Sequence, residues 1–176
     1  EFPAGSAQVP DLTAALDTLE SQLVDRQQQF AVLESLMSTR SLGERVLPGG
    51  WPIIGGWITS HFGHRSDPFT GRGAFHAGVD FTAPKGTKVI ATGPGVVSFS
   101  GHKTGYGNVV EITHPTGYMT RYGHNSRNLV SEGQTVQKGD PIAIIGSTGR
   151  STGTHVHFEV VRDGNTLNPM KYLSAP

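Results

Sequence analysis

Two histidines, His155 and His157, lie two residues apart in the stretch GTHVHFEV at residues 153–160. Polar and apolar residues alternate there as in a β-strand, whose side chains at positions i and i+2 point to the same face. We therefore expect two imidazoles side by side on a rigid element. Imidazole binds metal ions and also transfers protons near neutral pH, so either chemistry is open to this pair.

A second pair of such groups, His76 and Asp80, lies in the stretch FHAGVDF at residues 75–81. Gly78 disfavours a helix, and residues four apart on an extended segment share a face. The pair could thus converge with one of the two later histidines. Zinc prefers nitrogen and oxygen ligands in tetrahedral geometry, and a catalytic site uses three of them and leaves one position for water. Spacing alone does not decide which histidine binds and which is left to transfer protons.

The composition narrows the class of protein. The chain has 176 residues, which suits one ordinary domain with an appendage. Its 24 glycines and 11 prolines, with 35% hydrophobic residues, favour a turn-rich β domain. The 14 basic and 14 acidic residues balance, which gives no indication of a nucleic-acid partner. Cysteine is absent, so any metal must be held by His, Asp or Glu.

The first part of the chain has a different pattern. Residues 11–40 contain no Gly or Pro, and Pro10 and Gly43 are suited to the start and end of a helix. Apolar residues recur there with a heptad period, broken by Arg26, at Leu12, Leu16, Leu19, Leu23, Phe30, Leu33 and Met37. We expect one long amphipathic helix. It would either pack on its own domain or form a short coiled coil for self-association or docking on an envelope protein.

A Gly- and Pro-rich linker at residues 48–56 divides the chain into a helical segment, 1–47, and a domain, 48–176. Short segments rich in β-branched residues and bounded by turn residues follow, and they predict strands: TKVIATG, GVVSFSG, NVVEITH, YMTRYGH, DPIAIIG and HVHFEVV. Their close spacing, with no second long helix, predicts a mainly β domain. Its expected form is an open antiparallel β-sheet or a barrel-like sandwich.

Three segments carry a family resemblance: SHFGHRSDPFTGRGAFHAGVDF, YGNVVEITHPTGYMTRYGHN and VQKGDPIAIIGSTGRSTGTHVHFEV. In this order and spacing, over about residues 48–172, the chain resembles the lysostaphin-type, or LytM-domain, zinc metallopeptidases. The resemblance implies an open β fold with a groove over one zinc ion. It implies His76, Asp80 and His157 as the zinc ligands. It also implies His124 and His155 as catalytic histidines that flank the attacking water and the developing oxyanion.

The same resemblance implies an endopeptidase that hydrolyses peptide cross-links of bacterial peptidoglycan with metal-activated water. The helical segment resembles envelope members of Gram-negative bacteria, which cleave D-Ala–meso-diaminopimelate bonds. A periplasmic or cell-envelope location, with a membrane anchor upstream, is therefore expected. Because Glu1 and Phe2 resemble a cloning remnant, the lack of a visible signal peptide does not bear on this expectation. Three further residues are expected either to line the groove as substrate-binding groups or to hold its loops: Arg65, Tyr106 and Asn108.

Two other functions remain open at this point. A non-catalytic LytM domain that activates a cell-wall amidase would have lost zinc ligands, and this chain keeps all of them. A sugar-phosphotransferase IIA domain would carry phosphate on a histidine and would not need Asp80. Neither Glu111 nor Glu159 lies in an HExxH helix, so no glutamate base is expected. Of the remaining histidines, two are expected at the groove wall or surface, His61 and His64, and two in solvated turns, His102 and His114.

Overall fold

The structure is a computed structural model, and it describes Leu19, Leu23 and residues 47–173. Leu19 and Leu23 are helical and exposed. The rest of the helix expected over residues 11–40 lies outside this range, and the boundary between residues 47 and 48 remains a prediction. In the described part of the chain, no helix has the length and apolar character needed to cross a membrane.

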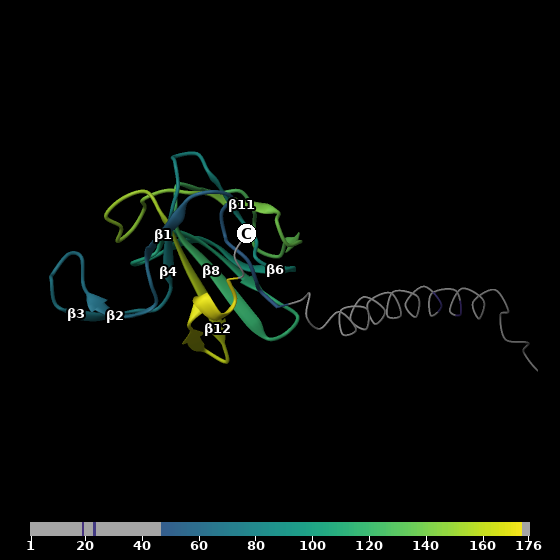
Figure 1. Cartoon of the computed structure of the whole chain (residues 1–176). Coiled ribbons are helices and arrows are strands. Elements are labelled where there is room, and N and C mark those ends of the chain that lie inside the picture. The colour runs from purple at the N-terminus through teal and green to yellow at the C-terminus, as the bar shows by residue number, and fades with distance from the viewer. Residues whose placement is uncertain (1–18, 20–22, 24–46, 174–176) are drawn as a thin grey trace, which may run out of the picture. The chain divides into compact units, whose positions relative to one another are not determined.

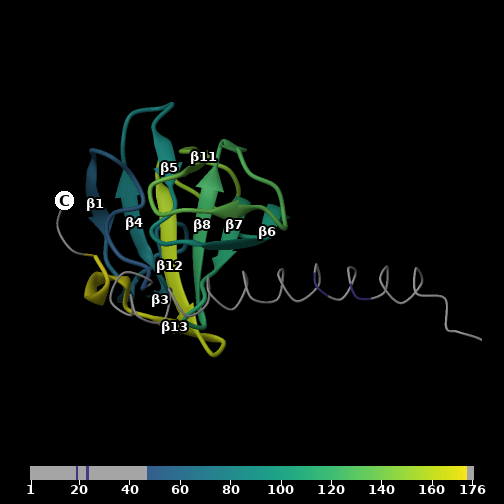
Figure 2. The same ribbon diagram turned by 90° about the vertical axis from the view of Figure 1, so that its right-hand side faces the viewer.

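An eight-stranded antiparallel sheet forms the body of the domain (Figures 1 and 2). Along its main path the strands follow the order β1–β4–β12–β8–β7–β6–β10, and β13 pairs with β12. The bounds are β1 Trp57–Ser60, β4 Val79–Thr82, β6 Gly95–Lys103, β7 Gly107–Thr113, β8 Tyr118–Asn125, β10 Thr135–Val136, β12 Val156–Arg162 and β13 Asn165–Leu167.

Two smaller antiparallel sheets complete the fold. One has the order β5–β11–β9, with bounds Lys88–Ile90, Pro141–Ile144 and Arg127–Asn128. The other is a hairpin of β2, Gly63–Ser66, and β3, Gly73–His76, which extends away from the body in Figure 1. A short 3-10 helix, η1, covers Pro169–Lys171. Each of the six predicted strand segments overlaps a strand, so the mainly β prediction is confirmed. The sheets are open and residues 47–173 form no closed barrel, so the barrel alternative is wrong.

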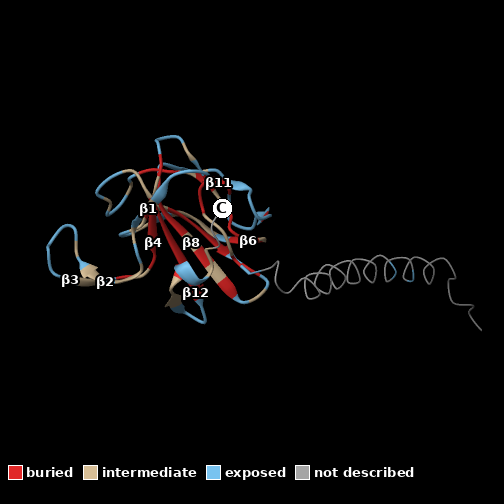
Figure 3. Ribbon diagram, in the orientation of Figure 1, coloured by how far each residue is buried: buried red, intermediate tan, exposed pale blue. Residues whose placement is uncertain are grey.

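The core lies between the large sheet and the three-stranded sheet. Alternate residues of β12, namely Val156, Phe158 and Val160, are buried in the same apolar cluster as Val89 and Ile142 of the small sheet. Burial of side chains of this size stabilises a fold by about 1.5–3 kcal/mol each. β12 is accordingly buried from Val156 to Val161 and exposed at its end, Arg162 (Figure 3). This packing holds β12 so that its alternate, polar residues are fixed on the opposite face of the sheet.

Two histidines differ from the solvated turn positions expected for them. His114 is buried, its Nδ1–H donates to the Pro94 carbonyl at 2.7 Å, and its Nε2 lies 2.8 Å from Thr120 Oγ1. Burial lowers the pKa of His114 even though the bond to Pro94 acts in the opposite direction. The prediction for His114 was therefore wrong, since tertiary packing covers this turn. His102 is exposed as expected, but it lies on β6.

Candidate metal centre and neighbouring histidines

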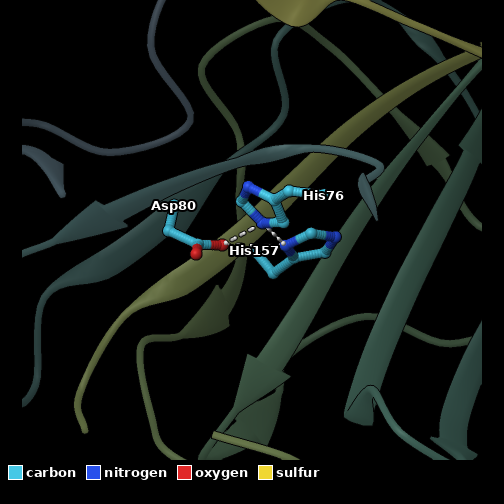
Figure 4. A group of neighbouring side chains, drawn as sticks. All are labelled: His76, Asp80 and His157. Atoms are coloured by element: carbon cyan, nitrogen blue, oxygen red, sulfur yellow. Dashed lines mark hydrogen bonds and ion pairs between the residues drawn. The ribbon is translucent and has the colours of Figure 1, made fainter. Parts of the chain in front are cut away.

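Three buried side chains, His76, Asp80 and His157, converge on one point (Figure 4). His76 Nε2 lies 3.1 Å from both Asp80 Oδ1 and His157 Nδ1, and His157 Nδ1 lies 2.8 Å from Asp80 Oδ1. Ligands at about 2.0–2.2 Å from a tetrahedral zinc ion lie roughly 3.3 Å apart. Two imidazole nitrogens and one carboxylate oxygen at this spacing therefore fit a single small ion such as zinc.

The three side chains come from three strands. His76 ends β3, Asp80 lies on β4, and His157 lies on β12 directly opposite Asp80 in the strand register. The sequence predicted that His76 and Asp80 converge, and they do. However, they do not share one extended segment, because the chain turns between two strands at Ala77 and Gly78. The convergence results from this turn and not from strand alternation.

Gly78 makes the turn possible because of its close approach to β12. A Cβ atom at this position would collide with the Phe158 carbonyl oxygen. It would also lie 2.8 and 2.9 Å from ring atoms of His157. Real Cβ atoms do not come this close to backbone atoms, so only glycine lets the β3–β4 turn pass over the His157 ring.

In each of the three side chains, the polar atom that does not face the common point forms a hydrogen bond with another residue. The Nδ1–H of His76 donates to the His61 carbonyl at 2.8 Å, and the Nε2–H of His157 donates to Glu159 Oε1 at 3.0 Å. Arg65 Nη1 donates to Asp80 Oδ2 at 3.3 Å. These bonds leave His76 Nε2, His157 Nδ1 and Asp80 Oδ1 facing the common point. Such outer bonds orient metal ligands and select their tautomer.

The metal-free cluster holds protons that a metal ion would displace. Burial alone would raise the pKa of Asp80, but the hydrogen bonds from His157 and His76 lower it well below its usual range. Burial alone would lower the pKa of His157, but its bonds to Asp80 and Glu159 raise it to about 9. At neutral pH Asp80 is therefore ionised and His157 carries both ring protons. Metal binding at Nδ1 must release one of them.

Two further histidines, His124 and His155, stand beside the cluster. The Nδ1–H of His155 donates to the Gly153 carbonyl at 2.8 Å, and its Nε2 lies 3.9 Å from Asp80 Oδ1. The Nδ1–H of His124 donates to the Thr148 carbonyl at 2.8 Å. A carbonyl oxygen can only accept, so both rings carry a proton on Nδ1, and in its neutral form each ring has a free lone pair on Nε2. Both rings can therefore accept a proton at Nε2.

His124 has an unusual backbone. Its φ of +65° lies in the left-handed region, which residues other than glycine rarely adopt and which is often found at functional sites. Burial lowers the pKa of His124 to about 4, despite the bond to Thr148, and the nearby His155 contributes in the same direction as burial. His124 is therefore a neutral imidazole at neutral pH.

An open groove of about 400 Å³ runs over the cluster, and all five of these histidine and aspartate side chains line it. Of the residues predicted to bind substrate, Arg65 and Tyr106 also line the groove. Asn108 does not, and its Nδ2 donates to the carbonyls of Asn125 and Ser126 at 3.1 and 3.2 Å. The structure thus places Asn108 as a support for the end of β8.

The groove walls are held together on one side by Arg150. Its Nη2 donates to both carboxylate oxygens of Asp67, at 2.7 and 2.6 Å, and its guanidinium lies 4.5 Å from the Phe69 ring centre. These contacts join the loop before β12 to the β2–β3 hairpin. His61 reaches the site only through its backbone carbonyl, and the side chain of His64 packs against Phe75 on the hairpin. Neither His61 nor His64 contributes a side chain to the groove lining.

Glu159 is the functional candidate that sequence reasoning missed. It is fully buried, and it bonds to His157, Tyr106 and Arg121. The signal was present in the sequence, because Glu159 follows His157 by two residues and must share its face of a strand. The absence of an HExxH helix excludes Glu159 as a base of that kind, but it does not exclude a role beside His157.

The chain is similar to several known proteins. The chain is 44% identical over 119 residues to the DD-carboxypeptidase/endopeptidase Mpg of Neisseria meningitidis serogroup B, which is 68% of this chain and 27% of that protein. It is 44% identical over 123 residues to the peptidoglycan DD-endopeptidase ShyA of Vibrio cholerae, which is 69% of this chain and 29% of that protein. The chain thus matches less than a third of the length of either relative.

A solved structure, a zinc-containing peptidase from Vibrio cholerae, superimposes with a TM-score of 0.65 at 40% identity, over 73% of this chain and 40% of that chain. The model of Peptidase family M23 matches residues 74–169, which is more than half of the sequence and contains every residue of the cluster. On this match, the chain belongs to Peptidase family M23.

Proposed function

We propose that this chain is a zinc-dependent endopeptidase that hydrolyses peptide cross-links of bacterial peptidoglycan. The observation that carries the proposal is the buried cluster of His76, Asp80 and His157 in an open groove, with His124 and His155 left free beside it. The names of the relatives support it, since two are called peptidoglycan DD-endopeptidase or DD-carboxypeptidase/endopeptidase. A similar solved structure is described as a zinc-containing peptidase.

A zinc ion held by the three ligands would supply Lewis-acid activation of a water molecule and of the scissile carbonyl. The protein supplies the proton transfers. His155 Nε2, with its lone pair free and 3.9 Å from the ligand atom of Asp80, accepts the proton of the attacking water. His124, neutral because it is buried, offers a second acceptor beside it. Once either ring is protonated at Nε2, it becomes a donor for the oxyanion or for the departing amine.

The two alternative functions each lack an observation in their favour. A domain that only activates an amidase does not need the ligands, yet the three ligand atoms here lie 2.8–3.1 Å apart with their outer bonds in place. A phosphotransferase domain is not a member of a peptidase family, and it would not bury Asp80 between two histidines. A measurement of the zinc content of the purified protein distinguishes the amidase-activating domain and the phosphotransferase domain from the peptidase.

The finer substrate proposal is the D-Ala–meso-diaminopimelate cross-link. Its test is digestion of purified Gram-negative peptidoglycan with product identification by mass spectrometry, beside a pentaglycine substrate. We expect cross-linked muropeptides to be converted to monomers, and a matched His155→Ala preparation to convert them on the order of 10²–10³-fold more slowly. Faster hydrolysis of pentaglycine than of cross-linked muropeptides would refute the substrate assignment.

The cellular location follows from the substrate. Peptidoglycan lies outside the cytoplasmic membrane, so we infer a periplasmic or cell-envelope enzyme. Self-association or docking on an envelope protein through the apolar stripe of residues 11–40 remains a prediction. Cell fractionation of the native protein tests the location.

A further inference from the structure

Glu159 is a carboxylate with no exposed surface, and all of its hydrogen-bond partners are side chains. Its Oε1 accepts from His157 Nε2–H at 3.0 Å and from the Tyr106 hydroxyl at 2.9 Å. Its Oε2 accepts from Arg121 Nη1. A buried carboxylate is tolerated only when it is paired and hydrogen-bonded in this way.

The pairing continues across the sheet. Arg121 lies directly opposite Glu159 on one side and Glu111 on the other. Its Nε donates to Glu111 Oε1 at 2.6 Å, and Lys103 Nζ donates to Glu111 Oε2 at 2.7 Å. Carboxylate, guanidinium, carboxylate and ammonium thus alternate across β12, β8, β7 and β6. We call these four residues, Glu159, Arg121, Glu111 and Lys103, the ionic row.

The ionic row distinguishes His157 from the other histidines of the groove. The outer nitrogens of His76, His124 and His155 each donate to a backbone carbonyl, whereas that of His157 donates to a carboxylate. A bond to an ionised acceptor is roughly twice as strong as a neutral one. A carboxylate partner also makes the ligand nitrogen more basic and fixes the ring orientation. Of the two histidine ligands, His157 is therefore the more firmly oriented.

We propose that Glu159 is a positioning residue of the metal centre, and that Arg121 in turn holds Glu159. Glu159 keeps the remaining proton of His157 on Nε2, so that Nδ1 faces His76 and Asp80. Stability alone does not account for the arrangement, because buried ion pairs add little net stability relative to apolar residues of the same volume. This inference rests on the proposed function only in requiring that the cluster binds zinc.

The test is the zinc dissociation constant of the full 176-residue chain, measured by competition with a chromophoric chelator. Removal of an outer partner of a metal ligand typically weakens metal binding by about 10–100-fold, and we expect this for Glu159→Ala. Glu159→Gln should weaken binding less, because the amide oxygen still accepts from Nε2–H but has no charge. Glu111→Gln is the matched control. It makes the same change in the same ionic row without touching a ligand, and it should stay within about twofold of wild type.

A spectroscopic measurement separates orientation from general damage to the fold. In the zinc-loaded protein, the His157 Nε2–H should give a slowly exchanging, downfield imidazole proton signal in NMR spectra. We expect this signal in wild type and in Glu111→Gln, and we expect it to be lost in Glu159→Ala. If Glu159→Ala does not fold, the zinc affinities of Glu159→Gln and Glu111→Gln still test the positioning role.

Equal zinc affinities of Glu159→Gln and Glu111→Gln, or a retained Nε2–H signal in folded Glu159→Ala, would overturn the positioning role. A wild-type chain that binds no zinc would instead overturn the proposed function, and this inference with it. Zinc binding by the wild type, with an affinity that falls in Glu159→Gln and falls further in Glu159→Ala, would support both the positioning role and the proposed function.

Discussion

The rings of His124 and His155 lie with their centres 4.7 Å apart, and neither belongs to the three-residue metal cluster. Both rings hold their proton on Nδ1 against a backbone carbonyl. The site therefore contains two kinds of histidine: His76 and His157, which belong to the cluster, and His124 and His155, which lie beside it. This division predicts two kinds of variant.

The ligand variants His76→Ala, Asp80→Ala and His157→Ala should lose zinc and, with it, activity, because a three-ligand site cannot spare one ligand. His124→Ala and His155→Ala should keep nearly stoichiometric zinc. Their rate should fall on the order of 10²–10³-fold, as for loss of one transition-state donor. The double variant should be less impaired than the product of the two effects, since groups that act together are not additive.

Elemental analysis of zinc in the five purified single variants, together with a peptidoglycan hydrolysis assay, tests this division. A metal-free His155→Ala beside a zinc-containing His157→Ala would show that the roles of these two histidines are exchanged.

Gly78→Ala should disrupt the centre although it removes no ligand. The added Cβ would collide with the Phe158 carbonyl oxygen and come within 2.9 Å of the His157 ring, so β4 and β12 must separate. We expect weaker zinc binding and a lower melting temperature, measured by chelator competition and thermal unfolding. Gly73→Ala is the control, because a Cβ there meets no atom within 4 Å. Similar behaviour of the two variants would contradict the packing argument.

The metal-free protein should lose stability as the pH rises from 7 to 9. Burial lowers the pKa of His157, but its bonds to Asp80 and Glu159 raise it to about 9, above the usual value near 6.5. The resulting stabilisation is complete below the unfolded-state pKa and is lost as the pH passes the folded-state value. By this linkage the loss between pH 7 and 9 is on the order of 2 kcal/mol.

Urea unfolding of the chelator-treated protein at several pH values measures this loss. The zinc-loaded protein should not show it, because its His157 carries no proton on Nδ1. A metal-free His157→Gln variant should not show it either. A metal-free wild type with constant stability over this range would refute the assignment to His157.

A chain that begins at residue 48 should fold and bind zinc with unchanged affinity, because all ligands and their outer partners lie after residue 60. Its folding can be followed by circular dichroism and its affinity by chelator competition. The full chain, compared by analytical ultracentrifugation, should differ only in self-association or partner binding. A truncated chain that does not hold zinc would refute this prediction.

Each of the six segments predicted as strands overlaps a strand, because the alternation of side chains is a local property. The same alternation placed His155 and His157 on one face. The prediction that His76 and Asp80 converge was correct, but the assumed cause, a shared extended segment, was wrong. The turn at Gly78 brings them together, and it depends on contacts with β12, about 80 positions downstream in the sequence.

The ionic row could not be predicted because it depends on strand register. Glu159, Arg121 and Glu111 are neighbours only because β12, β8 and β7 pair with those residues opposite one another. Nothing local in the sequence specifies this pairing. The same holds for His114, which sequence context places in a turn and which tertiary packing buries against Pro94 and Thr120.

The cluster also has a mechanical consequence. His76 and His157 are 81 positions apart in the sequence, and they belong to different sheets, the β2–β3 hairpin and the large sheet. An ion bound to both would close a long loop in a chain that has no cysteine for a disulfide. By the argument from loop entropy, such a closure stabilises mainly by restricting the unfolded chain. Zinc would then act as a reversible cross-link, and a chelator would lower the stability of the fold as well as stop the chemistry.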